Sequence, residues 1–164
     1  SIVFKTASEG VYLGVTSQTA ANLLDDYEEG IYTGTVNTET SGGFTMSSGA
    51  DTISYTKIGN LVTVLGRVSV TGDDSPNGQV RIALPFAVGA IAEQAGSAYT
   101  RGAILVNHAD GSTTANTVGW LDSASGAYCF LYEETHGTGA IGAVQPTTVD
   151  TAFSVELNLF YYTA

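Results

Sequence analysis

Positive charge is scarce in this sequence, which removes several classes of partner. The 164 residues contain five lysines and arginines against sixteen aspartates and glutamates, giving a formal charge of −11 at pH 7. Because so few cations are available to neutralise phosphates, we expect no nucleic-acid partner. An anionic bilayer would repel the chain, and no apolar run approaches the roughly 20 residues that span a membrane. No membrane insertion is therefore expected.

Cysteine and histidine are nearly absent as well. The single Cys129 cannot form an intrachain disulfide, and its place between Tyr128 and Phe130 predicts a small buried hydrophobic residue rather than a reactive thiol. The two histidines, His108 and His136, stand in turn-like segments, and neither a His-x-His nor a Cys-x-x-Cys pair occurs. We expect no metal site and no cofactor.

Catalytic motifs are missing or incomplete. The sequence has no Gly-x-Ser-x-Gly elbow. Residues 137–142 match the dinucleotide fingerprint, but Val144 and Pro146 follow where that fingerprint needs a helix, so we interpret them as a glycine-rich loop. Glu133 or Glu134 would form a glycosidase site only with a second acid at a suitable separation. The chain is therefore predicted not to be an enzyme.

What the sequence has instead is alternation of apolar and polar residues from position 31 onward. Gly59-Asn60 predicts a two-residue turn that pairs residues 53–58 with the strand that starts at Leu61. Gly66 interrupts that strand and predicts a bulge or the close approach of another backbone. The apolar face of residues 61–71 consists of four valines, Val62, Val64, Val68 and Val70.

Further strands are predicted between turn-forming segments. They cover residues 79–84, 99–106, 117–121, 127–132 and 153–161. Residues 73–78 read Asp-Asp-Ser-Pro-Asn-Gly and predict a long turn. Seven or eight strands without a clear helix favour an all-β fold, an antiparallel, jelly-roll-like β-sandwich. We assign residues 30–164 to this head domain.

Residues 1–29 form a predicted stalk or connector. This segment contains two short apolar pieces, residues 2–4 and 11–15. Two strands this short are unstable alone, so we expect identical segments of neighbouring chains to supply their partners. Four carboxylates within residues 25–29 indicate a solvated linker at the boundary with the head. The apolar residues expected in the stalk contacts are Ile2, Phe4, Val11, Tyr12 and Leu13.

Aromatic residues gather in the second half of the chain. On an uncharged, hydroxyl-rich surface, such rings are suited to stack on sugar faces. The alternative, that they are core or subunit contacts, stays open. The candidate ligand-binding residues are Trp120, Tyr99, Tyr128 and Tyr132, together with His108 and Asp110 from a turn between predicted strands.

Three segments resemble the carboxyl-terminal domain of bacteriophage fibre proteins. They are Leu-Asp-Asp-Tyr-Glu-Glu-Gly at 24–30, Tyr-Thr-Lys-Ile-Gly-Asn-Leu-Val-Thr-Val at 55–64, and Leu-Pro-Phe at 84–86. Related domains follow the first segment with a tryptophan and a proline, where this chain has Ile31-Tyr32-Thr33-Gly34. The resemblance implies a homotrimer with an intertwined stalk and a distal head that recognises a host-surface molecule. It implies no cofactor and no catalytic residue.

The favoured function is therefore a structural and host-recognition module of a virion fibre, located in a tail or capsid fibre. It would contact other virion proteins and bind a host-surface glycan or outer-surface protein. Two alternatives stay open. The first is a fibre or spike enzyme that cleaves the polysaccharide it binds, and the second is a capsid or inner tail protein that makes protein contacts only.

Overall fold

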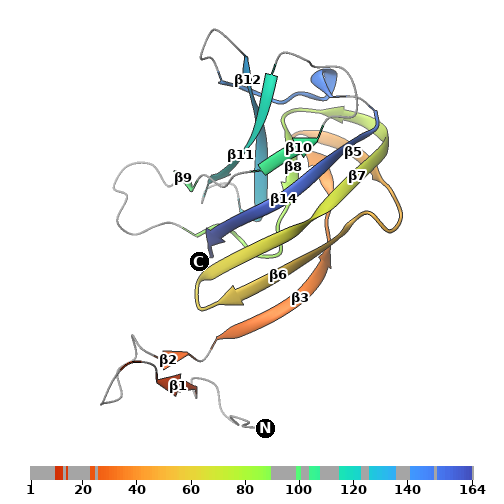
Figure 1. Ribbon diagram of the computed structural model, residues 1–164. Helices are drawn as coiled ribbons and strands as arrows, with labels where there is room; N and C mark the ends of the chain where they lie inside the picture. Colours follow the sequence, from red (N-terminus) through yellow and green to blue (C-terminus); the bar gives the residue numbers. More distant parts are fainter. Residues whose placement is uncertain are drawn as a thin grey trace.

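A computed structural model describes most of the head and short parts of the N-terminal segment (Figure 1). The described residues are 10–12, 14, 23–24, 26–89, 99–100, 104–107, 115–122, 126–135, 141–149 and 151–163. Within them, every regular element is a β-strand except one turn of 3-10 helix, η3 (Pro146–Thr148). All strand pairs are antiparallel, which confirms the predicted all-β antiparallel fold. No helix among these residues is long and apolar enough to cross a membrane.

The strands of the head form one sheet that folds over on itself around the core (Figure 1). One half runs in the order β3–β6–β7–β14–β10. These strands are β3 (Tyr27–Thr33), β6 (Thr52–Ile58), β7 (Leu61–Asn77), β14 (Phe153–Tyr162) and β10 (Ile104–Asn107). The turn at Gly59-Asn60 joins β6 to β7 with Ile58 opposite Leu61, so the predicted hairpin is confirmed.

The other half of the sheet runs in the order β4–β8–β12–β11–β9. Its strands are β4 (Val36–Thr38), β8 (Val80–Ala83), β12 (Tyr128–Thr135), β11 (Ala115–Asp122) and β9 (Tyr99–Thr100), with β13 (Ile141–Ala143) beside β12. Strand β5 (Ser41–Met46) pairs with β4 on one side and with the far end of β7 on the other. Through β5, the long strand β7 connects the two halves.

The core lies between the two halves and follows the predicted alternation. In β14 the buried positions are Phe153, Val155, Leu157, Leu159 and Tyr161, and in β7 they are Val62, Val64, Val68 and Val70. Strands β8, β11 and β12 close the core from the other half with Val80, Ile82, Leu121, Cys129 and Leu131. Gly66 lies against the backbone of Ile53. A Cβ added at Gly66 would stand 3.0 Å from the Cα of Ile53, which confirms the predicted close approach of another backbone.

The predicted turn over residues 73–78 is wrong for most of its length. Strand β7 continues to Asn77 and pairs with β5 through a register shift between Ser41 and Gly43. Gly42 at φ +70° and Ser75 at φ +48° provide the irregular backbone of this bulge. The chain changes direction only after Asn77, with Gly78 at φ +97°. Turn-forming residues are tolerated in this strand because β5 supplies their backbone partners.

The N-terminal segment pairs within its own chain, against the expectation that it lacks such partners. Strand β1 (Val11–Tyr12) pairs with β2 (Leu23–Leu24). Residues Ile2, Phe4 and Leu13, also expected in the stalk, lie outside the described residues.

Glu28 and Glu29 are exposed to solvent, as predicted, but they do not form a linker. They belong to β3 and pair with β6, so the boundary expected between residues 29 and 30 falls within a strand. Their carboxylates have tyrosine partners, since the Tyr27 hydroxyl donates to Glu29 and the Tyr55 hydroxyl donates to Glu28. These two hydrogen bonds explain how the carboxylates of Glu28 and Glu29 are accommodated in an edge strand.

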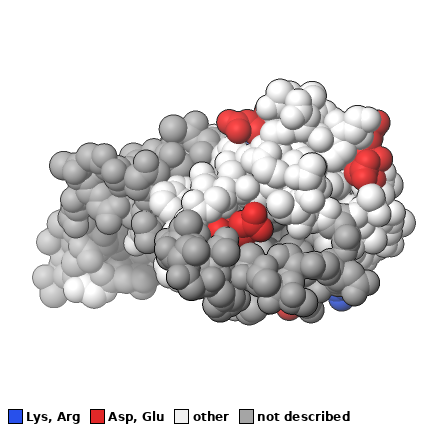
Figure 2. Space-filling model, turned by 90° about the horizontal axis from the view of Figure 1, so that it is seen from above, with Lys and Arg blue, Asp and Glu red and all other residues white. Residues whose placement is uncertain are grey.

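Formal charge is sparse on the described surface. Figure 2 shows one face, seen from above, on which most of the described residues are uncharged and the acidic side chains form separate spots. Among the residues with described side chains, Lys57 and Asp26 form the one ion pair. The surface is consequently dominated by hydroxyl, amide and apolar groups.

Cys129 is expected to be chemically inert in the folded protein. Its side chain is fully buried, and this burial raises the pKa of the thiol to about 12. At pH 8 only about one thiol in ten thousand is then ionised, and it has no access to reagent. Iodoacetamide should leave the native protein unmodified by mass spectrometry and add one carbamidomethyl group in denaturant. Fast labelling of native protein would contradict the buried position.

Candidate ligand-binding site

An aromatic surface covers the outer side of β8, β11 and β12. In the register of these strands, Trp120 lies opposite Phe130 and Arg81 lies on the other side of Phe130. Because alternate residues of a strand share a face, Tyr128 and Tyr132 lie on this side too, while Cys129 and Leu131 face the core. We call this set the aromatic platform, formed by Arg81, Trp120, Tyr128, Phe130 and Tyr132.

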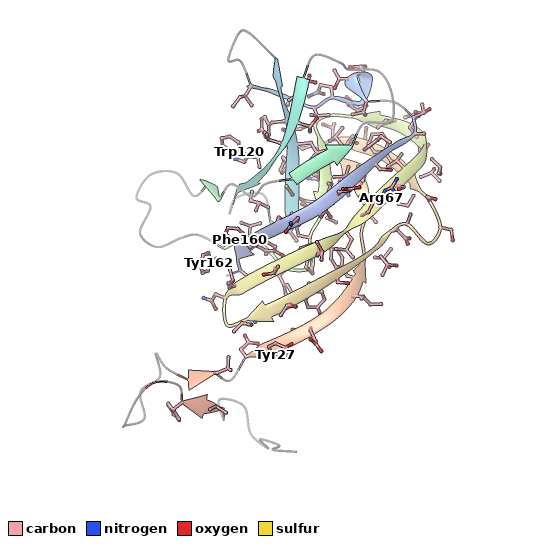
Figure 3. All side chains as sticks on the ribbon, viewed as in Figure 1. Tyr27, Arg67, Trp120, Phe160 and Tyr162 are labelled. Carbon is pink, nitrogen blue, oxygen red and sulfur yellow. The ribbon has the colours of Figure 1, made fainter. Side chains whose placement is uncertain are left out.

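The rings of the platform contact one another and remain partly open to solvent. The centroids of Trp120 and Tyr132 are 5.3 Å apart at an interplanar angle of 46°, and both side chains are half-buried. Figure 3 shows Trp120 beside β11, in a different part of the surface from Tyr27. A tilted pair of this kind presents ring faces and edges to a ligand.

Arg81 places a positive charge beside the rings. Its guanidinium carbon lies 3.9 Å from the centroid of Tyr128 and 5.8 Å from that of Phe130, within cation–π distance. Its Nε–H donates to Oδ1 of Asn37 at 2.8 Å, which fixes the orientation of the guanidinium. A held guanidinium beside an aromatic ring is suited to donate hydrogen bonds to ligand oxygens.

The structure brings together three of the predicted binding residues, Trp120, Tyr128 and Tyr132. Tyr99 lies in β9 with its backbone paired to Asp122 at the edge of β11, and its side chain is not among those described. His108 and Asp110 lie outside the described residues.

Sequence reasoning missed Arg81 and Asn37 as site residues. The available signal was the alternation in residues 79–84, which puts Arg81 on the face opposite Val80 and Ile82. That pattern shows that Arg81 faces away from the core, but the pairing of β8 with β12 was needed to place it beside the rings.

Solved structures include a tailspike with this fold. The crystal structure of the Dettilon tailspike protein matches 83% of this chain with a TM-score of 0.58 and 19% sequence identity. This chain is similar in fold to a phage tailspike. It covers 24% of the Dettilon chain and so spans about a quarter of that protein. No family model and no curated protein matches the sequence.

The likeness to the Dettilon tailspike is a likeness of fold. At 19% identity it concerns the fold and transfers no binding residue. The chemistry of the platform therefore has to be argued from this chain alone. Rings, an amide and a guanidinium on an otherwise uncharged surface match the groups that bind the apolar faces and hydroxyls of sugars.

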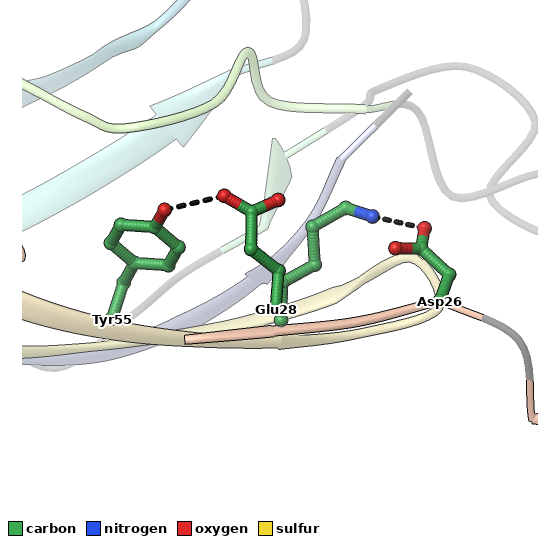
Figure 4. Close-up of polar contacts among 4 residues, drawn as sticks. Asp26, Glu28 and Tyr55 are labelled. Carbon is green, nitrogen blue, oxygen red and sulfur yellow. Dashed lines mark hydrogen bonds and ion pairs between the residues drawn. The ribbon is translucent and has the colours of Figure 1, made fainter. Parts of the chain in front are cut away.

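A second polar cluster connects β3 to β6 (Figure 4). Tyr55 donates to Glu28 at 2.5 Å, and Lys57 forms an ion pair with Asp26. The hydrogen bond to Glu28 raises the pKa of Tyr55, because an ionised Tyr55 could no longer donate this bond and would face a carboxylate. Phe86 packs edge-on against Tyr55 at 5.2 Å. These contacts hold the edge strand in place.

The described residues contain no group of three or more histidine, cysteine, aspartate or glutamate side chains placed to hold a metal ion. The glycine-rich segment at 137–142 does not open an α-helix. Its last two residues belong to strand β13 (Ile141–Ala143), and the helical turn that follows, η3, is a 3-10 turn that begins only at Pro146. The interpretation that rejected dinucleotide binding agrees with this geometry.

Proposed function

We propose that this chain is the head of a bacteriophage tail spike or fibre, assembled as a homotrimer in the virion, and that it binds a host-surface carbohydrate. The observation that carries the proposal is the aromatic platform, in which the Trp120–Tyr132 pair and the held guanidinium of Arg81 share one outer face. The fold shared with the Dettilon tailspike supports the assignment to a virion appendage.

Binding would be multivalent. A single shallow platform gives weak affinity for a sugar, but three platforms held in one assembly can bind neighbouring repeat units of a polysaccharide at the same time. The gain comes from effective concentration and requires no additional contact. Attachment to a cell surface that carries many identical glycans matches this arrangement.

We propose binding without cleavage. Polysaccharide hydrolysis requires two carboxyl groups on either side of the bond that is cut. In β12, Glu133 alternates with Tyr132 and takes the side of Leu131 and Cys129, whereas Glu134 takes the strand position on the side of Tyr132. The register partners of Glu134 are Asn116 and Ile141, and neither supplies the second carboxyl group. The platform residues themselves include no carboxylate.

The test is loss of carbohydrate binding in Trp120→Ala. On a glycan array that carries bacterial surface polysaccharides, we expect wild-type protein to bind and the variant to bind at least about tenfold more weakly, since a lost ring contact is amplified by multivalency. Thr33→Ala, an exposed change in the other half of the sheet, is the control and should bind as wild type.

Circular dichroism separates a binding role for Trp120 from a structural one. A folded Trp120→Ala variant with unchanged binding would contradict the proposal, as would absence of binding by wild type. If Trp120→Ala unfolds, Arg81→Ala tests the same platform from its other end, because that side chain is not in the core. Unchanged carbohydrate binding by folded Arg81→Ala would then contradict the proposed site.

A further inference from the structure

A large apolar surface covers the outer side of β3, β6, β7 and β14. Seven of the eleven large hydrophobic side chains that are exposed among the described residues lie on it. Ile31 is 71% exposed, Leu65 60% and Phe160 59%. We call this surface the apolar face, formed by Tyr27, Ile31, Ile58, Leu61, Leu65, Phe160 and Tyr162.

Strand register makes these residues neighbours. Tyr27 pairs with Ile58, Ile58 with Leu61, and Leu61 with Tyr162, so one row across four strands consists entirely of large apolar side chains. The next row contains Phe160 and the row after it contains Ile31 and Leu65. Figure 3 shows Phe160 and Tyr162 at one end of β14 and Tyr27 at the start of β3.

This surface cannot turn inward, because the alternate positions of the same strands already form the core. Tyr161 and Leu159 of β14 are buried, as are Val62 and Val64 of β7. With strands about 4.8 Å apart and residues about 3.3 Å apart, three rows over four strands cover roughly 400 Å² in projection. That is within the range of roughly 300–600 Å² of the largest apolar patch on a typical monomer, a patch that is often functional.

Charge identifies the partner. The three rows contain twelve positions, and Glu29 is the one charged residue among them. Two copies of a chain with net charge −11 repel each other, so they can meet closely only where acidic groups are few. A basic partner would be drawn to acidic surface instead. Four of the seven large side chains, Ile31, Ile58, Leu61 and Leu65, are aliphatic and offer neither a ring face nor a hydrogen bond to a carbohydrate.

We propose that three copies of this chain bring their apolar faces together around a common axis, so that one part of the face on each copy contacts another part of the face on the next copy. This rests on the homotrimeric assembly in the proposed function and names the surface that forms it. Side chains of facing sheets interdigitate, and here the smaller side chains of Ser54, Thr56 and Thr63 lie among the large apolar ones. Roughly 400 Å² is about half of one side of a standard interface of about 800 Å² per partner.

The apolar rows therefore correspond to an interface core, which requires a polar rim. Such a rim is present beyond the third row, where Arg67 lies opposite Glu156 and donates to Ser154 Oγ at 2.8 Å. Opposite charges at this margin can pair with those of a second copy without adding net repulsion.

The test is the solution mass of the intact chain and of Leu65→Glu, measured by light scattering at several concentrations. We expect wild type at three times the 16.9 kDa protomer, and Leu65→Glu as a folded monomer or with a dissociation constant raised at least about 100-fold, since a buried unpaired carboxylate is strongly unfavourable. Ile141→Glu, a matched change at a 52% exposed isoleucine in β13, should assemble as wild type.

A wild-type chain that is monomeric throughout, or a Leu65→Glu variant that assembles as wild type, would overturn the inference. If Leu65→Glu does not fold, the uncharged Leu65→Ser should still weaken assembly, and no weakening would overturn the inference as well. Failure here is separable from failure of the proposed function. A monomer that loses carbohydrate binding on Trp120→Ala keeps the proposed binding site and removes the interface together with the trimer.

Discussion

Replacing Gly42 by alanine is expected to destabilise the head by about 3 kcal/mol or more. Gly42 has φ +70°, a conformation that costs an L-residue roughly 1–2 kcal/mol. Its Cβ would also stand 2.4 Å from the carbonyl oxygens of both Asp74 and Ser75, so backbone has to move. Because domains are stable by only about 5–15 kcal/mol, urea denaturation should show a much lower midpoint.

Gly49→Ala provides the matched control for Gly42→Ala. Gly49 also has a positive φ, +80°, but nothing lies within 4 Å of the position of an added Cβ. It should therefore lose only the conformational contribution of about 1 kcal/mol. Equal losses in the two variants would show that the bulge between β5 and β7 is not closely packed.

Ile53→Ala is expected to reduce the free energy of unfolding by about 2–5 kcal/mol through loss of packing and a residual cavity. Ile53 is fully buried in β6, between the core valines and two glycines that make room for it. A Cβ on Gly34 would stand 2.4 Å from Ile53 Cδ1, and one on Gly66 would stand 3.2 Å from Ile53 Cγ2. Urea denaturation measures the loss.

Ile31→Ala is the control for Ile53→Ala, since it removes the same atoms from an exposed position of the adjacent strand. At 71% exposure, the change should alter protomer stability by no more than about 0.5 kcal/mol. Both variants have to be measured at a concentration where the protein is not assembled, because association raises apparent stability. A large effect of Ile31→Ala on the monomer would show that this residue has a packing role within the chain.

Local pattern was sufficient to predict the central strands. The hairpin at Gly59-Asn60 and the alternation of β14 depend on residues adjacent in sequence and on burial of one face, which the period of two reports directly. Gly66 could be predicted for the same reason, because a glycine on an apolar face needs a backbone neighbour to fill its space.

Long-range pairing explains where the sequence misled. Residues 73–77 have the composition of a turn, yet β5 supplies ladder partners from more than 25 residues earlier in the chain. The carboxylates of Glu28 and Glu29 indicated a linker, yet both residues lie in β3, and the Tyr55 hydroxyl of the paired strand β6 donates a hydrogen bond to Glu28. Composition alone does not reveal such partners.

The aromatic platform was predicted only in part for the same reason. Trp120, Tyr128 and Tyr132 lie in two strands that follow each other in sequence, so their proximity could be expected. Arg81 reaches them because β8 pairs with β12, a contact between distant segments. The apolar face was equally hidden, since only the register of four strands places Phe160 and Ile31 on the same surface.

The row that joins Tyr27 to Tyr162 has a practical consequence for protein engineering. The first strand of the head and its last strand reach the same end of the sheet with β6 and β7 between them, roughly 14 Å apart at the usual strand spacing. A linker of about five residues spans that gap. A head that is joined across this gap, by grafting into a loop of another protein or by circular permutation, is expected to keep the same strand pairs in its sheet.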